Sequence, residues 1–327
     1  MTNSSAPRYI NPYTDFGFKK LFGTELNKEL LVSFLNALFE GEQEITELHY
    51  LSSEKLGANQ ESRRAIFDVY CENTHGEKFI VEMQNVFQQF YKDRSVYYAT
   101  FPIQEQANRG KEWNFRLNRV YTVGILNFVF PEDEYSPECM HHKVQLMDVD
   151  DKHVFFDKLT FIYLEMPKFK KTEDELKTLL DKWLFVLSNL SRLMERPVAL
   201  QERVFTRLFE QAEIARYTPE EQKRYYDNYK AYRDIHNAVD TARNEGREEG
   251  IAVGREEGIA VGREEGIAVG REEGIAVGRE EGAEKEKRMT ARRMFQNGMD
   301  VKTVSVATGL SNAEIQRILN EINSELN

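Results

Sequence analysis

The sequence predicts an α/β fold in which a mixed sheet is covered by helices and followed by a helical C-terminal extension. Over residues 1–170, short runs rich in β-branched and aromatic residues alternate with segments that carry apolar residues at helical spacing. From residue 171 onward, the apolar spacing predicts helices. The order of helix, three strands, helix and strand is typical of a mixed sheet with helices packed on it.

The first expected helix begins at Thr14 or Asp15, either of which can cap it, and it continues through LFGTELNKELLVSFLNALF. Residues 117–130 are apolar on both faces, as a central buried strand would be. The remaining elements of this region are expected as strands at 45–54, 63–73, 77–87 and 159–166, and as a helix at about 88–108.

Helical patterns continue over residues 171–191 and 200–215, and a new helix begins at Thr218-Pro219. Thr218 is the expected cap, Pro219 fits the first turn, and Glu221 completes a capping box. The chain therefore divides into a first domain with appended helices, a tandem repeat and a small helical tail. The expected boundaries are 1–245, 246–282 and 283–327.

The repeat REEGIAVG runs from Arg247 to Gly282 and is either a long marginal helix or a flexible linker. A glycine at every fourth residue destabilises a helix by about 1 kcal/mol each relative to Ala. The same glycines leave a smooth ridge where another helix could approach, and the helix is the favoured interpretation. The repeat offers only exposed Arg and Glu, so no catalytic role is expected.

The tail is expected to form three short helical segments whose spacing resembles that of a helix-turn-helix. Its predicted signals are a helix that ends at Asn297-Gly298, a second helix from Asp300 to a stop at Gly309, and a third capped by Ser311 and Glu314. A DNA-reading helix should be cationic, whereas residues 300–327 carry a net charge of −2. A hairpin for packing or self-association is therefore preferred over a DNA reader.

The net charge of −11 argues against a nucleic-acid enzyme until its distribution is considered. Five REEG copies contribute −5, whereas residues 1–120 hold 14 Lys and Arg against 16 Asp and Glu. Two cysteines form no disulfide framework, and no apolar run is long enough for a membrane span. The first ten residues lack the pattern of a signal peptide, and a cytoplasmic protein without a membrane partner is expected. Basic groups that could meet nucleic acid, or be ordinary solvated surface, are Lys19-Lys20, Arg63-Arg64, Arg109, Lys111, Arg116 and Arg119.

One predicted hairpin carries the chemistry. Thr74-His75-Gly76 fits a three-residue loop, which pairs residue 73 with 77 and therefore Asp68 with Glu82. Opposed like charges among apolar neighbours destabilise a hairpin unless a cation lies between them. Mg²⁺ held by one or two carboxylates would serve, with Gln84 on the same face to bind a water. The alternative is that each carboxylate pairs with a surface Lys or Arg, and His75 is expected to be only a turn residue.

The sequence resembles the recombination-promoting nuclease and putative transposase family, part of the PD-(D/E)XK nuclease superfamily. The motifs that carry the resemblance are NPYTDFGFKKLFG (11–23), FDVYCEN (67–73), FIVEMQ (79–84) and DRSVYY (93–98). It covers roughly residues 8–245. The resemblance implies a restriction-endonuclease-like core and a Mg²⁺-dependent DNA endonuclease that acts in recombination or on mobile or foreign DNA.

Carried over by position, the resemblance makes Asp68 and Glu82 the metal ligands and places Asp15 where an acidic residue joins the site. Mn²⁺ is an alternative ion, and the effect of Ca²⁺ is left open. The superfamily usually has Lys where this chain has Gln84. Lys brings positive charge to the attacking water or the phosphate, whereas Gln can only orient them. The implied partner is double-stranded DNA, and a homodimer or larger assembly through the repeat and tail is expected because cutting both strands needs two sites.

Arg94 and Tyr98 lie one helical turn apart on the helix after the catalytic strand. They either contact the scissile phosphate or hold Glu82 and Gln84, or the helix merely packs on the sheet with Arg94 paired locally. Aromatic residues of this helix are expected in the core rather than as a platform for bases: Phe90, Tyr91, Tyr97 and Phe101. The alternative to an endonuclease is an inactive DNA-binding or scaffold protein of the same fold.

Overall fold

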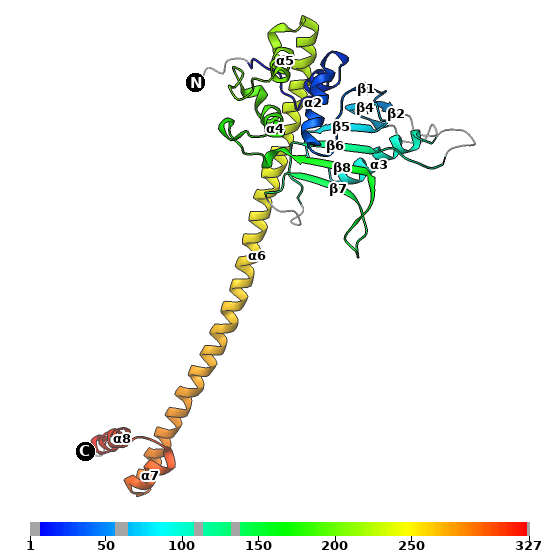
Figure 1. The fold of residues 1–327 in the computed structure, drawn as a ribbon. Coiled ribbons are helices and arrows are strands. Elements are labelled where there is room, and N and C mark those ends of the chain that lie inside the picture. The colour runs from blue at the N-terminus through cyan, green and yellow to red at the C-terminus, as the bar shows by residue number, and fades with distance from the viewer. Residues whose placement is uncertain (1–6, 56–64, 108–113, 132–137, 326–327) are drawn as a thin grey trace. The chain divides into compact units, whose positions relative to one another are not determined.

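The computed structural model describes residues 7–55, 65–107, 114–131 and 138–325. The chain forms two compact units, Met1–Val239 and Asp240–Asn327. Figure 1 shows the strands gathered in the first unit and the last two helices in the second.

Eight strands make up a six-stranded sheet and a separate two-stranded one within the described residues. The strands are β1 (Leu48–Tyr50), β2 (Glu54–Lys55), β3 (Ala65–Ile66), β4 (Val69–Asn73), β5 (Lys78–Gln84), β6 (Val120–Leu126), β7 (His141–Met147) and β8 (Val154–Glu165). The large sheet has the order β1-β4-β5-β6-β8-β7, and β2 pairs with β3. The β5–β6 and β6–β8 pairs are parallel and the others antiparallel, so the predicted mixed sheet with flanking helices is confirmed.

Helices precede, interrupt and follow these strands. The α-helices are α1 (Asp15–Phe22), α2 (Lys28–Leu38), α3 (Tyr91–Glu105), α4 (Leu179–Asn189), α5 (Arg203–Ala212), α6 (Pro219–Gln296), α7 (Val301–Thr308) and α8 (Asn312–Glu325). Short 3-10 turns are η1 (Glu25–Asn27), η2 (Met166–Lys168), η3 (Glu173–Glu175), η4 (Leu190–Arg192) and η5 (Ile214–Arg216). Because β5 and β6 are parallel, the chain must cross over between them, and α3 lies on that crossover (Figure 1).

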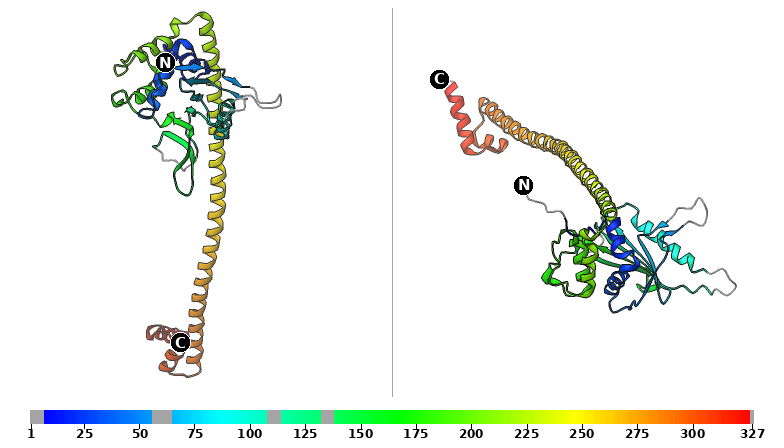
Figure 2. Two further views of the ribbon diagram at one scale, coloured as in Figure 1. Left: turned by 45° about the vertical axis from the view of Figure 1, so that its right-hand side comes forward. Right: turned by 90° about the horizontal axis from the view of Figure 1, so that it is seen from above.

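The two faces of the large sheet bury different helices, as the two views of Figure 2 help to follow. Alternate residues of β4 and β5, such as Cys71 and Val81, join the main core with α1, α2, α4 and α5. The residues between them, such as Tyr70 and Ile80, pack with α3 side chains on the other face. Glu82 is two residues beyond Ile80, so its side chain lies on the α3 face.

Several predicted elements differ from the structure. The first helix is interrupted after Phe22 and resumes as α2, with η1 between them. The strand expected over 63–73 is broken at Phe67-Asp68, because the Phe67 N–H donates to Ser53 O at 2.9 Å toward the small sheet. Residues 63 and 64 lie outside the described part. The strand β7 was not predicted, since it is largely exposed and lacks a hydrophobic alternation.

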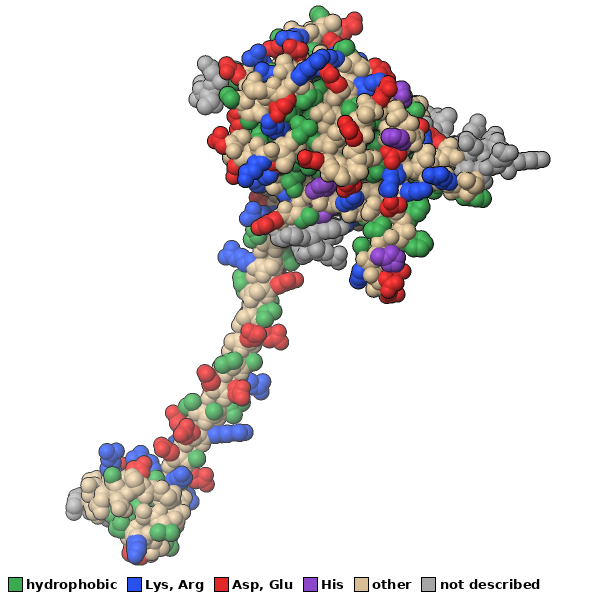
Figure 3. Space-filling model, in the orientation of Figure 1, with side chains coloured by type: hydrophobic (Ala, Val, Ile, Leu, Met, Phe, Trp, Pro, Cys, Tyr) green, Lys and Arg blue, Asp and Glu red, His purple; other side chains and the backbone are tan. Residues whose placement is uncertain are grey.

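In this structure the repeat is helical throughout, as part of α6. Helix α6 begins at the predicted box, where the Thr218 N–H donates to Glu221 Oε2 at 3.0 Å and the Glu221 N–H donates to Thr218 Oγ1 at 3.2 Å. Along the repeat, acidic, basic and apolar side chains are interspersed on the surface of the helix (Figure 3). Within the described residues, no helix is both long and apolar enough to cross a bilayer.

Candidate active site

The β4–β5 hairpin has the predicted register. The loop 74–76 ends with a glycine at φ +74, and the ladder pairs Val69 with Val81. Continuing this register by one residue, beyond the last pair of the ladder, sets Asp68 opposite Glu82. The sequence-predicted acidic pair is therefore brought together at the end of the hairpin, on the face covered by α3.

Each carboxylate accepts a hydrogen bond from the backbone next to the other. The Asp68 N–H donates to Glu82 Oε1 at 3.2 Å, and the Met83 N–H donates to Asp68 Oδ2 at 2.9 Å. Asp68 lies just before β4 begins, so side-chain oxygens stand in here for the missing carbonyl partners of the ladder. The two acids are held by the same bonds that close the end of the hairpin.

The electrostatics of this pair are unfavourable for two negative charges. Burial, and then the charge of Asp68, raises the pKa of Glu82 to about 8. Burial is also the main cause that raises the pKa of Asp68. Lys19 and Arg94 act in the opposite direction on both groups but do not cancel these causes. The site is short of positive charge, and a divalent cation between the carboxylates would supply it.

Gln84 is fixed by hydrogen bonds at both ends of its amide. Its Oε1 accepts from an Arg94 Nη at 2.5 Å, and its Nε2 donates to Val86 O at 3.0 Å. The other Nη of Arg94 donates to Gln88 Oε1 at 2.6 Å. Arg94 therefore holds Gln84, as one of the sequence-based alternatives proposed. It also brings positive charge beside a position that is neutral in this chain.

Tyr98 supports the site from the side. Its ring packs edge-on against Phe67 at 5.3 Å between centroids, and the Arg94 guanidinium lies 5.7 Å from its ring centroid. Burial raises the pKa of the Tyr98 phenol, and the Glu82 charge adds to the shift. Tyr98 thus helps to position Arg94 through its ring.

Two residues that the sequence-based prediction missed shape the space around Glu82. Gly124 is the residue of β6 that pairs with Glu82 on the neighbouring strand. A Cβ at Gly124 would clash with the hydroxyl of Tyr91, so only glycine admits the buried Tyr91 ring here. Burial, followed by the Glu82 charge, raises the pKa of Tyr91. A glycine inside an otherwise bulky strand was the available signal, since it often marks a close approach.

Asp15 lies near the pair but is engaged elsewhere. Its carboxylate forms an ion pair with Lys19 at 2.6 Å, one turn along α1. Asp15, Asp68 and Gln84 line one cavity of about 300 Å³. The helix begins with Thr14 as its cap, whose Oγ1 accepts from Gly17 N at 3.0 Å. Asp15 therefore reaches the same cavity, and the charge of its partner Lys19 acts on both Asp68 and Glu82.

The donor set suits a hard cation with few protein ligands. Within the described ranges, no group of three or more His, Cys, Asp or Glu side chains is close enough together to hold a metal. Asp68 and Glu82 alone match the one or two carboxylates that Mg²⁺ commonly takes. A bound divalent cation would lower the raised pKa values of both carboxylates, so these residues fit the implied metal.

The other predicted basic groups do not gather at this cavity. Lys20 forms an ion pair with Glu221 at 2.6 Å, and Arg119 forms one with Asp157 at 2.5 Å. Arg119 precedes β6, at the end of the strand opposite to the one beside Gln84. Arg116 is exposed. Four of the predicted basic residues lie outside the described part: Arg63, Arg64, Arg109 and Lys111.

The aromatic residues of the α3 region divide between core and surface. Tyr91 is 3% exposed and Phe101 packs beside Phe67, as predicted. Phe90 and Tyr97 are 68% and 40% exposed, so the prediction of a core position is wrong for these two. Tyr97 lies on the solvent face of α3, and Phe90 precedes the first residue of that helix.

The second unit contains a compact helical tail with the predicted caps. Asp300 Oδ1 accepts from Lys302 N and Thr303 N, α7 ends at Gly309 with φ +69, and the Ser311 N–H donates to Glu314 Oε2 at 2.9 Å. A separate hydrophobic cluster holds the three segments together, and its buried members are Ala291, Val304, Leu310, Ile315 and Ile318.

Comparisons with known proteins match both units. Residues 12–242 match the family described as PD-(D/E)XK nuclease family transposase. Residues 285–320 match the C-terminal HTH domain of the Rpn/YhgA-like nuclease family. No curated protein and no solved structure matches the chain.

The tail match corrects the preference for a mere packing hairpin, because an HTH domain suggests DNA binding. Residues 300–327 carry −2, but the matched domain begins at residue 285, on the end of α6. Over 285–320 the chain has seven Lys and Arg against three Asp and Glu, a net charge of +4. The matched domain is therefore cationic, as a DNA reader should be. Nothing in the comparisons supports self-association.

Proposed function

Because the chain belongs to the PD-(D/E)XK nuclease family transposases, we propose that it is a divalent-metal-dependent DNA endonuclease that hydrolyses phosphodiester bonds during recombination or the processing of mobile or foreign DNA. The observation that supports this most strongly is the pairing of the half-buried Asp68 with the buried Glu82, whose pKa values are raised by burial and repulsion. Asp68 lines the 300 Å³ cavity, and perturbed carboxylates at a cavity are typical of catalytic sites.

Asp68 and Glu82 would hold the ion, Mg²⁺ in the first instance and Mn²⁺ as the alternative. A divalent cation in such a site supplies Lewis-acid chemistry, since it offsets negative charge that develops on a phosphate. Gln84 keeps a lone pair on Oε1 besides the one used by Arg94, and that lone pair can orient the attacking water. Arg94 stabilises the orientation of Gln84 and adds positive charge beside it.

Nicking of supercoiled plasmid by the purified full-length protein tests the proposal. The reaction is run in Mg²⁺, Mn²⁺, Ca²⁺ and EDTA, with Asp68→Asn and Glu82→Gln in parallel. Both variants keep an oxygen that can accept the backbone bond, so folding should be preserved. Glu47→Gln is the matched control, because Glu47 is exposed. Cleavage that needs metal, survives in the control and is lost in both site variants would support the endonuclease.

An inactive DNA-binding protein of the same fold is the second candidate. Two observations favour it: a neutral Gln84 stands where the superfamily usually has Lys, and the HTH match concerns a second unit. In that case the protein would shift DNA in a gel, while no metal would produce nicking. Cleavage that persists unchanged in Asp68→Asn and Glu82→Gln would contradict both candidates.

A further inference from the structure

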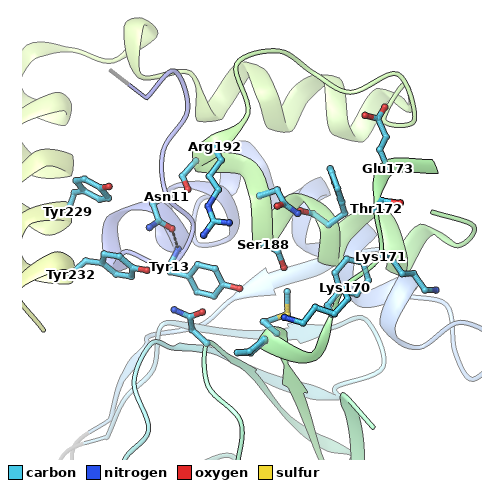
Figure 4. Close-up of a pocket in the computed structure, with 17 residues that line it drawn as sticks. Asn11, Tyr13, Lys170, Lys171, Thr172, Glu173, Ser188, Arg192, Tyr229 and Tyr232 are labelled. Carbon is cyan, nitrogen blue, oxygen red and sulfur yellow. Dashed lines mark hydrogen bonds between the residues drawn. The ribbon is translucent and has the colours of Figure 1, made fainter. Parts of the chain in front are cut away.

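A second cavity lies beside the carboxylate site, within the first unit. Its volume is about 780 Å³, within the range of small-molecule and cofactor pockets. Its walls come from the segment before α1, the turn after β8, the end of α4 with η4, and the first turns of α6 (Figure 4). No residue in these walls was assigned a role by the sequence.

The charged side chains around this cavity are mostly cationic. Arg192 and Lys170 are exposed, and among the described residues neither makes an ion pair or a hydrogen bond. Lys171 is committed to Asp181 at 2.6 Å. Glu173, the one carboxylate in the described wall, accepts from Ala199 N at 3.1 Å. Two uncommitted cations at the mouth of a polar cavity can take a phosphate.

Flat aromatic faces form another wall. Tyr229 and Tyr232 are half-buried on successive turns of α6, with ring centroids 6.1 Å apart and planes 9° apart. Tyr13, from the segment before α1, lines the same cavity (Figure 4). The pKa of Tyr13 is raised by burial, and the nearby Arg192 charge opposes this shift, so the phenol and the guanidinium share one space. Aromatic faces beside cations are the common design of single-strand binding surfaces.

A serine hydroxyl lies beside the Tyr13 ring. Ser188 lines the same cavity, and its hydroxyl lowers the pKa of the Tyr13 phenol, against the effect of burial. A hydroxyl can both donate and accept a hydrogen bond, so Ser188 adds a polar group to the aromatic side of the cavity.

The two cavities are adjacent and share part of their lining. Tyr13 and Tyr232 line both the large cavity and the 300 Å³ cavity of the carboxylates. Asn127 lines the large cavity and donates from its backbone to Gln84 O at 2.9 Å. Its side chain donates to Asn85 Oδ1, also at 2.9 Å, and Asn85 lines the small cavity. One extended ligand could therefore occupy both.

We propose that the large cavity binds a single-stranded nucleic-acid segment next to the scissile phosphate. A base would stack on the Tyr13 and Tyr229–Tyr232 faces, and its phosphates would meet Arg192 and Lys170. Bases inside a duplex already stack on each other, so a concave aromatic pocket selects an unpaired base. This inference rests on the proposed nuclease function and gives it a substrate class, DNA with a single-stranded flank or fork.

The test measures binding separately from cleavage. Full-length Glu82→Gln protein in EDTA is titrated with fluorescent oligonucleotides: a single-stranded oligo-dT, a blunt duplex and a duplex with a dT overhang. Arg192→Met and Tyr229→Leu are made in this background. Arg203→Met and Tyr226→Leu are matched controls, since Arg203 and Tyr226 are exposed and do not line the cavity. Thermal melts establish that each variant is folded.

Both cavity variants are expected to lose affinity for the single strand and the overhang duplex on the order of tenfold, with the blunt duplex and the controls little changed. Unchanged single-strand binding in both folded variants, or no single-strand binding by the parent, would overturn the inference. Competition by free dTMP as strong as by the oligonucleotide would assign the cavity to a nucleotide effector and would also overturn it. Plasmid nicking by the wild-type protein is scored in parallel, so failure of the nuclease proposal is seen independently.

Discussion

At the residue scale, Asp68 and Glu82 are well hydrogen-bonded, but their surroundings disfavour a negative charge on both. Asp68 and Glu82 each accept a backbone N–H beside the other, yet burial raises the pKa of both. The Asp68–Glu82 pair is therefore a place where the protein is less stable when both groups are ionised.

Glu82→Gln should stabilise the protein in EDTA at pH 8. The folded-state pKa of Glu82 is raised from 4.5 to about 8, so its contribution to stability is full below about pH 4.5 and is lost as the pH rises through 8. The variant has no such loss, and its melting temperature should change less between pH 5 and pH 8. Thermal melts across this range measure the difference, which corresponds to a few kcal/mol at pH 8.

Mg²⁺ should raise the melting temperature of the wild type at pH 8 and leave Glu82→Gln nearly unchanged, because only the wild type gains a counter-charge for both carboxylates. Glu47→Gln serves as the exposed control and should behave as the wild type. For the pH prediction above, melting temperatures of the wild type and Glu82→Gln that change in parallel between pH 5 and pH 8 would show that the charge of Glu82 does not determine stability.

Gln84 and Arg94 should behave as one unit in cleavage. Gln84→Ala and Arg94→Met are each expected to lower the rate of plasmid nicking by roughly ten- to a hundredfold, since each removes one end of the same hydrogen bond. The double variant should be little worse than either single one, because partners in one interaction are not additive. Single-turnover rates of the four proteins give the coupling, and strictly multiplicative losses would contradict it.

The sequence predicted the acidic pair because a hairpin register follows from a three-residue loop. It did not predict Lys19 or Tyr91 at the site, since their positions depend on how α1 and α3 pack on the sheet. The only signal for Gly124 in the sequence was that a glycine interrupts a strand of otherwise large side chains. The partners of Arg94 were left open for the same reason: the helical period predicts which residues share a face, but not the side chains that the face meets.

At the scale of elements, long periodic segments were predicted well and exposed ones poorly. The α6 start and the three tail segments followed their capping residues, which act locally. The β7 strand has no apolar alternation to reveal it, and the large exposed residues Val149 and Phe155 sit in the hairpin that joins it to β8. The interruption after Phe22 and the break at Phe67-Asp68 come from tertiary packing rather than from propensity.

The pattern of the repeat explains why it presents no single packing face. Eight residues advance an α-helix by two turns and about 80°, so the Ile and Val positions wind around the helix axis. These side chains are between 48% and 64% exposed from Ile251 to Val277. A helix without a continuous apolar stripe has little to bury against a partner helix.

Replacing the repeat glycines by alanine should strengthen this helix. A Cβ at Gly254, Gly262, Gly270 or Gly278 meets no atom within 4 Å, so each substitution should stabilise the helix by about 1 kcal/mol. Amide hydrogen exchange over 247–282 measures the effect as slower exchange. Gly309→Ala is the opposed control, because its φ of +69 makes a side chain strained there. Unchanged exchange in the fourfold variant would favour a linker in solution.

At the scale of the whole molecule, the acidic total charge conceals an uneven distribution. The chain has a net charge of −11, the five REEG copies contribute −5, and residues 285–320 carry +4. A single number for the chain would have excluded DNA binding, whereas the matched HTH domain has the sign that DNA requires.

Neutralising the tail should weaken DNA binding and its dependence on salt. Arg288→Gln with Arg293→Gln is expected to lower affinity for duplex DNA at low salt. The slope of log K against log salt should fall by about 1 for each DNA phosphate that the variant no longer neutralises. Binding isotherms at several salt concentrations measure both quantities. Lys223→Gln, an exposed cation of the first unit, is the control. Equal slopes for the double variant and the wild type would place the DNA-binding surface elsewhere.

The reciprocal hydrogen bonds of Asp68 and Glu82 have a consequence for how this gene can change. A single-base substitution converts Asp to Asn or Glu to Gln, and either amide still offers an oxygen to the same backbone N–H. Such a change would keep the fold and remove the repulsion between two buried charges. A chain under selection for folding alone would drift toward those amides. The presence of both acids therefore points to selection for their charge.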